Sequence, residues 1–138
     1  DAVAKGASLR LGGKPMEGTG YFFEPTVLTE VDHRMLVMQE ESFGPIIGIQ
    51  KVSGDDAALE LMNDTRYGLT ASVYTASEQR ARAMMGRLNA GSVYWNCCDR
   101  VSPRLPWTGW GDSGVGSTLG HDGIRAFIQP KAWHLRQG

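Results

Sequence analysis

The chain has 138 residues, with 14 Lys or Arg against 15 Asp or Glu, so its formal net charge is −1. A protein that binds nucleic acid or an anionic membrane through charge usually carries a clear basic excess, and this chain has none. The longest stretch without a charged residue or histidine has eleven residues (67–77), well short of the ~20 that span a bilayer.

The composition is that of an ordinary globular chain, with 41% hydrophobic and 21% charged residues and a length that fits one domain. Glycine is the exception, at 18 of 138 residues. The two cysteines, Cys97 and Cys98, are adjacent and form neither a disulfide framework nor a Cys-x-x-Cys site. This cysteine usage indicates a reducing compartment, and we expect a cytoplasmic protein.

The first elements are short. Residues 2–6 have the pattern of the last turn of a helix, with a lysine near its end and a glycine just after it. A helix without its start suggests that the chain is part of a longer polypeptide. Residues 7–11 alternate and predict a strand, and residues 21–28 predict a second extended segment in which Pro25 favours an edge or irregular strand.

The middle of the chain predicts an α/β fold. Residues 46–52 are β-branched and predict a strand, and an acidic turn then opens a helix over residues 55–64. A strand at 70–75, a helix that opens at Ser77 and a strand at 91–96 follow. This order predicts a βαβαβ unit, which builds a parallel sheet with flanking helices.

The last third of the chain is less regular. Residues 100–120 are rich in glycine and punctuated by proline, which predicts a long ordered loop, and such loops are uncommon unless they are functional. In open α/β sheets, sites collect at the carboxyl ends of the strands, and the third predicted strand ends at Asn96. Residues 124–135 alternate strongly and predict a closing strand.

Three patterns in the chain favour ordinary structural roles. Gly109 to Gly114 match G-x-G-x-x-G, but no apolar strand precedes them and no acid lies ~20 residues after them, so a Rossmann phosphate loop is not indicated. Ser113 lies in a Gly-Asp-Ser-Gly segment, yet no histidine has the setting of a catalytic base, so we expect a turn. Isolated histidines and adjacent cysteines give no metal-ligand spacing, so we expect no metal.

Four blocks of sequence are more specific. They occur in one order: Gly-Tyr-Phe-Phe-Glu-Pro-Thr-Val-Leu at 20–28, Gln-Glu-Glu-Ser-Phe-Gly-Pro at 39–45, Asn-Asp-Thr-Arg-Tyr-Gly-Leu at 63–69, and Asn-Ala-Gly-Ser-Val-Tyr-Trp-Asn at 89–96. In order and spacing they resemble the C-terminal part of the catalytic domain of the NAD(P)-dependent aldehyde dehydrogenase superfamily. Ser-Gly-Val-Gly at 113–116 continues the similarity, which covers nearly the whole chain.

The resemblance implies a mechanism for the complete enzyme. A cysteine thiolate attacks the aldehyde, the thiohemiacetal gives a hydride to NAD or NADP, and a glutamate activates the water that releases the acid. In the family this cysteine, this glutamate and the Rossmann domain lie before the first block. We therefore expect residues 1–138 to be a C-terminal segment without catalytic residues of its own and without turnover in isolation.

The resemblance also implies roles for six residues. Glu41 matches the glutamate that accepts hydrogen bonds from the nicotinamide ribose, and Phe43 matches the aromatic residue beside the nicotinamide; the alternative for Glu41 is an exposed acid before a strand. Positions near the aldehyde pocket are matched by Cys97, Asp99, Val101 and Trp107. Core packing is an equal alternative for Trp107, and Cys97 is not the family's nucleophile.

The sequence departs from the family at Ser117-Thr118 and Gly111-Asp112, which puts inherited coupling between the subunit interface and the active site in doubt. Residues 124–138 resemble the arm that pairs with a neighbouring subunit, so we expect a homo-oligomer with an aldehyde as substrate and no nucleic-acid or membrane partner. One alternative is a truncated module that binds other subunits without chemistry. A weaker alternative is a serine hydrolase built on Ser113, which a fluorophosphonate probe would label.

Overall fold

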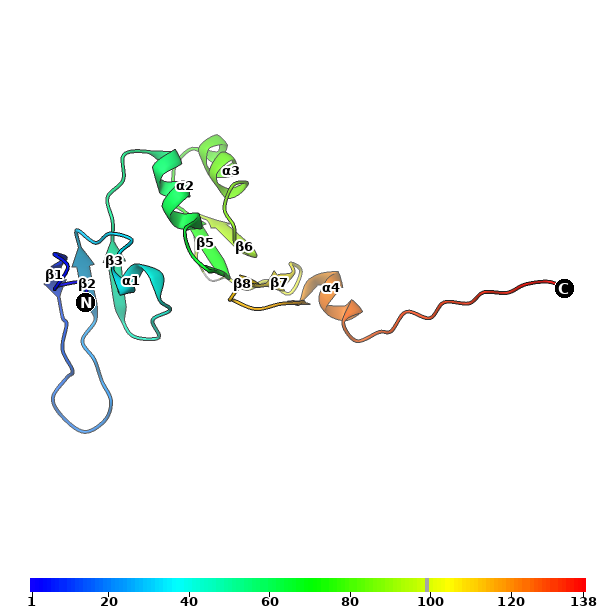
Figure 1. Cartoon of the computed structure of the whole chain (residues 1–138), viewed down its shortest axis with the longest axis horizontal. Coiled ribbons are helices and arrows are strands. Elements are labelled where there is room, and N and C mark those ends of the chain that lie inside the picture. Colours follow the sequence, from blue (N-terminus) through cyan, green and yellow to red (C-terminus); the bar gives the residue numbers. More distant parts are fainter. Residues whose placement is uncertain (99) are drawn as a thin grey trace. The chain divides into compact units, whose positions relative to one another are not determined.

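The computed structural model describes residues 1–98 and 100–138, and it divides into two compact units, Asp1–Leu61 and Met62–Gly138. In the first unit, strands β1 (Ser8–Leu11), β2 (Thr26–Thr29) and β3 (Ile46–Ile49) form a sheet in that order (Figure 1). β1 is antiparallel to β2, and β2 is parallel to β3. The short helix α1 (Leu36–Gln39) packs against β3.

The core of the first unit lies between this sheet and α1. Gly48 on β3 allows the close approach, because a Cβ atom there would lie 2.8 Å from Met38 Sδ. Met35, just before α1, is 1% exposed. The buried core residues are Ala2, Ala7, Leu28, Val31 and Met35.

The turn predicted at residues 2–6 is present. The Lys5 N–H donates to the Asp1 carbonyl over 3.0 Å, and Gly6 has a φ of +105°. The Asp1 carboxylate accepts a hydrogen bond from the Leu36 N–H (2.9 Å) and pairs with Lys5 Nζ (2.9 Å). This contact satisfies one of the free N–H groups at the start of α1.

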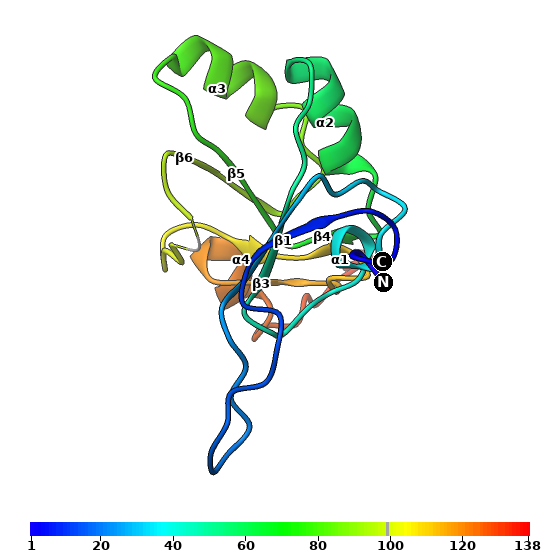
Figure 2. The ribbon, with the colours of Figure 1, turned by 90° about the vertical axis from the view of Figure 1, so that its left-hand side faces the viewer.

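The second unit contains a parallel strand–helix–strand arrangement. Helix α2 (Asp55–Asn63) ends just inside this unit and is followed by β4 (Tyr67–Gly68) and β5 (Thr70–Val73). Helix α3 (Glu78–Met85) joins β5 to the parallel strand β6 (Ser92–Trp95) and packs against both strands (Figure 2). Helix α3 turns an apolar face inward, since Ala81 and Met84 are buried, and Leu88, just after the helix, is buried too.

The predicted single βαβαβ sheet is wrong in one respect. All five elements form, but β3 pairs with β2, whereas β5 and β6 form a separate two-stranded sheet. The register of β3 runs from Thr26↔Ile46 to Thr29↔Ile49, so β2 is the strand that pairs with it. The α/β class and the β5–α3–β6 unit agree with the prediction.

The predicted loop at residues 100–120 contains three strands of two residues each. β7 (Trp107–Thr108) pairs antiparallel with β9 (Ser117–Thr118), and β8 (Trp110–Gly111) pairs antiparallel with β4. The Thr108 hydroxyl donates to the Gly116 carbonyl over 2.7 Å. The loop is therefore ordered by backbone pairing at several points.

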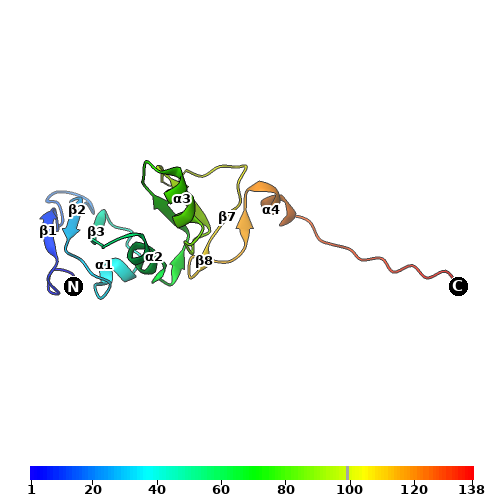
Figure 3. The same ribbon diagram turned by 90° about the horizontal axis from the view of Figure 1, so that it is seen from above.

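The predicted closing strand at residues 124–135 does not form. Helix α4 (Gly120–Arg125) packs against β9 and takes up the first two of these residues (Figure 3). Residues 126–127 form a turn, and residues 128–138 are in neither helix nor strand. A strand needs a partner for its N–H and C=O groups, and this segment pairs with no strand in the part of the chain that the structure describes.

Candidate functional site

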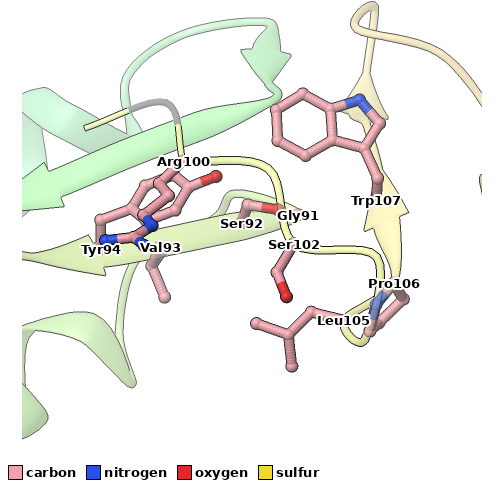
Figure 4. Close-up of a pocket in the computed structure, with 9 residues that line it drawn as sticks. All are labelled: Gly91, Ser92, Val93, Tyr94, Arg100, Ser102, Leu105, Pro106 and Trp107. Carbon is pink, nitrogen blue, oxygen red and sulfur yellow. The ribbon is translucent and has the colours of Figure 1, made fainter. Parts of the chain in front are cut away.

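A hollow of about 230 Å³ opens in the second unit between β6 and the loop that leads to β7 (Figure 4). Gly91, at the start of β6, forms part of its wall. The apolar side chains around it are Val93, Leu105, Pro106 and Trp107. The polar side chains around it are Ser92, Tyr94, Arg100 and Ser102.

Glycine is required at position 91. A Cβ atom there would lie 1.8 Å from the Thr108 carbonyl oxygen, closer than any real contact. The start of β6 and strand β7 can approach each other only because this side chain is absent. The close approach fixes one wall of the hollow.

Trp107 is the predicted pocket residue that lies at this hollow. It stands on β7, opposite Thr118 of β9, and is half-buried. In Figure 4 its ring and Tyr94 lie on opposite sides of the view. Trp107 lines the hollow, and its role at an aldehyde pocket stays a prediction.

Asn96 closes the carboxyl ends of β5 and β6. Its Oδ1 accepts a hydrogen bond from the Thr75 N–H (2.9 Å), and its Nδ2 donates to the Thr75 carbonyl (3.0 Å). Its φ of +52° is in the left-handed region, which asparagine tolerates better than most residues. The chain therefore leaves β6 in a fixed direction, toward the loop that contains the hollow.

Two of the other predicted pocket residues, Cys97 and Val101, are not among the residues that line the hollow. Cys97 is a half-buried free thiol, and the neighbouring Cys98 is exposed. A hydrogen bond with Cys98, and secondarily burial and the charges of the two thiols, raises the pKa of Tyr74. Val101 is 53% exposed and stands between two lining residues without lining the hollow itself. Asp99 lies outside the described residues.

Glu41 and Phe43 lie in the first unit, between α1 and β3, and both are exposed. Phe43 is 95% exposed, which leaves most of an apolar ring in water. The segment itself is held in place, because the Pro45 carbonyl accepts a hydrogen bond from the Thr26 N–H over 2.8 Å. An acceptor-only carboxylate and an open ring two residues apart fit a ligand that brings hydroxyl groups and a flat ring.

Ser113 has a structural role. It follows β8 in a turn, as predicted, and its Oγ accepts a hydrogen bond from the Gly68 N–H over 3.0 Å. The neighbouring Asp112 pairs with Arg66, with Arg66 Nε 3.5 Å from Asp112 Oδ2. Gly109 is needed because a Cβ atom would lie 2.4 Å from the Ser113 carbonyl oxygen. The glycines at 109–114 thus serve this turn.

Within residues 1–98 and 100–138, no three His, Cys, Asp or Glu side chains are grouped so that they could hold a metal ion. No helix in the same ranges is long and apolar enough to cross a membrane.

The polar lining of the hollow was missed in the sequence. Tyr94, Arg100 and Ser102 are among its residues, and none was singled out. The signal for the region was present, because the loop after a parallel strand is where α/β sites form. The individual residues were not identifiable, because this loop has no period that tells inward from outward positions.

The sequence profile of the aldehyde dehydrogenase family matches residues 1–133. An aldehyde dehydrogenase of Enchytraeus buchholzi is 40% identical over 132 residues, covering 96% of this chain and 27% of its own length. An NADP(+) succinate-semialdehyde dehydrogenase of Mycobacterium ulcerans is 37% identical over 131 residues, covering 95% of this chain and 29% of its own length. The chain therefore belongs to the aldehyde dehydrogenase family.

A solved structure has the same fold. The crystal structure of betaine aldehyde dehydrogenase from Staphylococcus aureus in complex with NAD+ superposes with a TM-score of 0.86 at 35% identity, over 91% of this chain and 26% of that chain. That structure is a complex with NAD+, and the mycobacterial relative is named for NADP(+). The chain spans about a quarter of the length of the relatives that it matches.

Proposed function

We propose that residues 1–138 form the C-terminal part of the catalytic domain of an enzyme that oxidises an aldehyde to a carboxylic acid with NAD+ or NADP+. The observation that carries the proposal is the family match over residues 1–133. The nucleophilic cysteine and the general-base glutamate are supplied by residues outside this chain, and the reaction passes through a thiohemiacetal on that cysteine. The isolated chain is inactive.

The chain contributes binding groups to this reaction. Glu41 accepts hydrogen bonds from the hydroxyls of the nicotinamide ribose, and the exposed ring of Phe43 packs beside the nicotinamide. The nicotinamide, when bound, accepts the hydride. The loop from Asn96 to Trp107, with Cys97, Asp99 and Val101, forms part of the wall of the aldehyde pocket, where Trp107 excludes water from one side.

Substitution of Glu41 tests the cofactor role in the complete enzyme. Glu41→Gln replaces an acceptor-only carboxylate by an amide, and we expect the KM for NAD(P)+ to rise about ten-fold while the KM for the aldehyde changes little. Steady-state kinetics with each substrate varied in turn measure both constants. Glu17→Gln makes the same change at an exposed acid of the same unit and should leave both constants unchanged. Equal effects of the two variants would contradict the role of Glu41.

One observation favours a second function, a module that binds other aldehyde dehydrogenase subunits without chemistry. The segment after α4 exposes large apolar side chains, including Phe127 (90%) and Trp133 (72%). Such side chains fit a protein interface better than open solvent. Mixing the isolated chain with an intact homologue, followed by size-exclusion chromatography, tests the module. A complex supports it, and separate elution contradicts it.

A further inference from the structure

We propose that the hollow between β6 and the loop before β7 holds the anionic end of the substrate, and that Arg100 selects aldehydes that carry a carboxylate on a short chain. This inference rests on the proposed function, because it names the substrate class of the same site. Arg100 then acts as a specificity residue that contacts the substrate away from the reacting carbon.

Charge is the first argument. Of the nine residues that line the hollow, Arg100 alone carries a charge. No other residue in the ranges 1–98 and 100–138 forms an ion pair with it. A guanidinium has five N–H donors and no acceptor, and its fork matches the two oxygens of a carboxylate. An anionic ligand would supply the acceptors that this side chain lacks.

Two hydroxyl groups that line the same hollow can also donate hydrogen bonds. The Ser102 Oγ accepts a hydrogen bond from the Arg104 N–H over 3.4 Å, which leaves its own proton available for a ligand. The Tyr94 hydroxyl also lines the hollow, and no described residue forms a hydrogen bond with it. Among the nine described residues that line the hollow, none has a carboxylate side chain. These described residues therefore favour an anion over a cation.

Size and apolar surface restrict the rest of the ligand. The hollow has a volume of about 230 Å³, less than the ~300–1,000 Å³ of sites for drug-sized ligands. Leu105 and Trp107 give it an apolar side, and Figure 4 shows them on one side of the view with Tyr94, Arg100 and Val93 on the other. A ligand with a short aliphatic chain against the apolar side and a carboxylate toward Arg100 fits both sides of the hollow.

Kinetics of the complete enzyme test this selection. The substrates are 4-oxobutanoate and its methyl ester, which differ in the negative charge and in one methyl group. We expect kcat/KM to favour the acid, and we expect Arg100→Gln to reduce the acid-to-ester ratio about ten-fold to a hundred-fold. Arg100→Lys keeps the charge without the fork and should reduce the ratio less. An unchanged ratio in Arg100→Gln would overturn the proposal.

Arg104→Gln is the matched control. Arg104 is an exposed arginine of the same loop that does not line the hollow. Its replacement removes the same charge from the same loop, so it separates contact with the ligand from the general field of the protein. A ratio that falls equally in Arg104→Gln and Arg100→Gln would contradict a specific role of Arg100.

A binding measurement separates this inference from the proposed function. Butanedioate is titrated into the protein by isothermal calorimetry, and we expect binding that Arg100→Gln weakens about ten-fold or more and that Arg104→Gln retains. Binding with this pattern but no oxidation of any aldehyde would support the anion site and contradict the proposed function. Oxidation of both aldehydes without butanedioate binding or a preference for the acid would support the function and overturn the anion site.

Discussion

Asn96 shows how one side chain can fix the exit of a strand. Its backbone N–H donates to the Val73 carbonyl (3.0 Å), and its amide makes two further hydrogen bonds with Thr75. Three hydrogen bonds thus join the segments that follow β5 and β6 to each other and to the end of β5, and the positive φ of Asn96 changes the direction of the chain there. The loop that bears Arg100 and Trp107 starts from this point.

Replacement of Asn96 should destabilise the second unit. Asn96→Ala loses both side-chain bonds and keeps an unfavourable positive φ, and we expect the free energy of unfolding to fall by about 2 kcal/mol. Urea denaturation followed by tryptophan fluorescence measures it, since the Trp95 indole donates to the Thr75 carbonyl over 2.9 Å. Asn96→Gly tolerates the backbone and should cost less than alanine. An alanine variant as stable as the glycine variant would contradict the argument from φ.

Asp32 gives the first unit a dependence on acid pH. Its carboxylate accepts hydrogen bonds from the side chain and the N–H of Arg34, with Arg34 Nη2 2.6 Å from Oδ2. The hydrogen bond from the Arg34 side chain is the main cause that lowers the pKa of Asp32 from 3.8 to about 2. The folded-state pKa lies below the unfolded one, so this contact stabilises the fold above about pH 4 and is lost as the pH falls toward 2.

The test is the free energy of unfolding measured by urea at several pH values between about 4 and 2. We expect the free energy of unfolding of Asp32→Asn to be lower than that of the wild type near pH 4 and to approach it near pH 2. The difference should be small because the pair is exposed to solvent. For Glu17→Gln, at another exposed acid, the free energy of unfolding should change with pH as it does in the wild type. A constant gap between Asp32→Asn and the wild type would contradict the link to this carboxylate.

At the scale of the element, α3 begins at the position that the sequence predicts. Ser77 has an extended backbone, and its Oγ accepts a hydrogen bond from the Arg80 N–H over 3.2 Å. Glu78 then pairs with Arg82 one turn later, with Arg82 Nη2 2.7 Å from Glu78 Oε1. The cap and the buried stripe both hold α3 across the β5–β6 pair.

Loss of the cap should lower stability by a predictable amount. Ser77→Ala removes the acceptor for one of the free N–H groups at the helix start, and we expect the free energy of unfolding to fall by about 1 kcal/mol. Circular dichroism during urea denaturation measures it. Ser77→Thr keeps a hydroxyl at the same position and should retain most of the stability. If the threonine variant lost as much as the alanine variant, the hydrogen bond to Arg80 would not be the cause.

Local signals in the sequence sufficed for some elements and not for others. Ser77 and the stripe of α3 were predictable because a cap and a helical period lie within a few residues. The partner of β3 was not, because pairing with β2 depends on residues about twenty positions away. The residues of the hollow and the absence of a strand at 124–135 depend in the same way on non-local contacts, since a loop has no period and a strand needs an edge.

At the scale of the whole molecule, much apolar surface faces solvent. In the first unit Leu9, Leu11 and Ile47 are each about half exposed although they lie in a sheet. In the second unit the segment after α4 exposes Phe127, Ile128, Trp133 and Leu135. A stable monomer rarely leaves so many large apolar side chains open, so we expect the rest of the enzyme or a second subunit to cover them.

Removal of apolar side chains from the last segment should weaken self-association. We expect the double variant Phe127→Ser and Trp133→Ser to shift the protein toward the monomer, because an interface would lose two aromatic anchors. Size-exclusion chromatography with light scattering gives the mass in solution. Tyr21→Ser removes an equally exposed aromatic ring from the loop between β1 and β2 and should leave the mass unchanged. An unchanged mass in the double variant would contradict an interface at this segment.

The close contact at Gly91 limits how this protein can be redesigned. A library that varies the substrate range cannot begin at position 91, because any side chain there collides with the Thr108 carbonyl oxygen and must displace β7. Ser102 and Leu105 line the same hollow from the loop before β7, and both already carry side chains there. Changes of volume or polarity at these two positions should be tolerated, so directed evolution toward larger or neutral aldehydes has its natural starting points there.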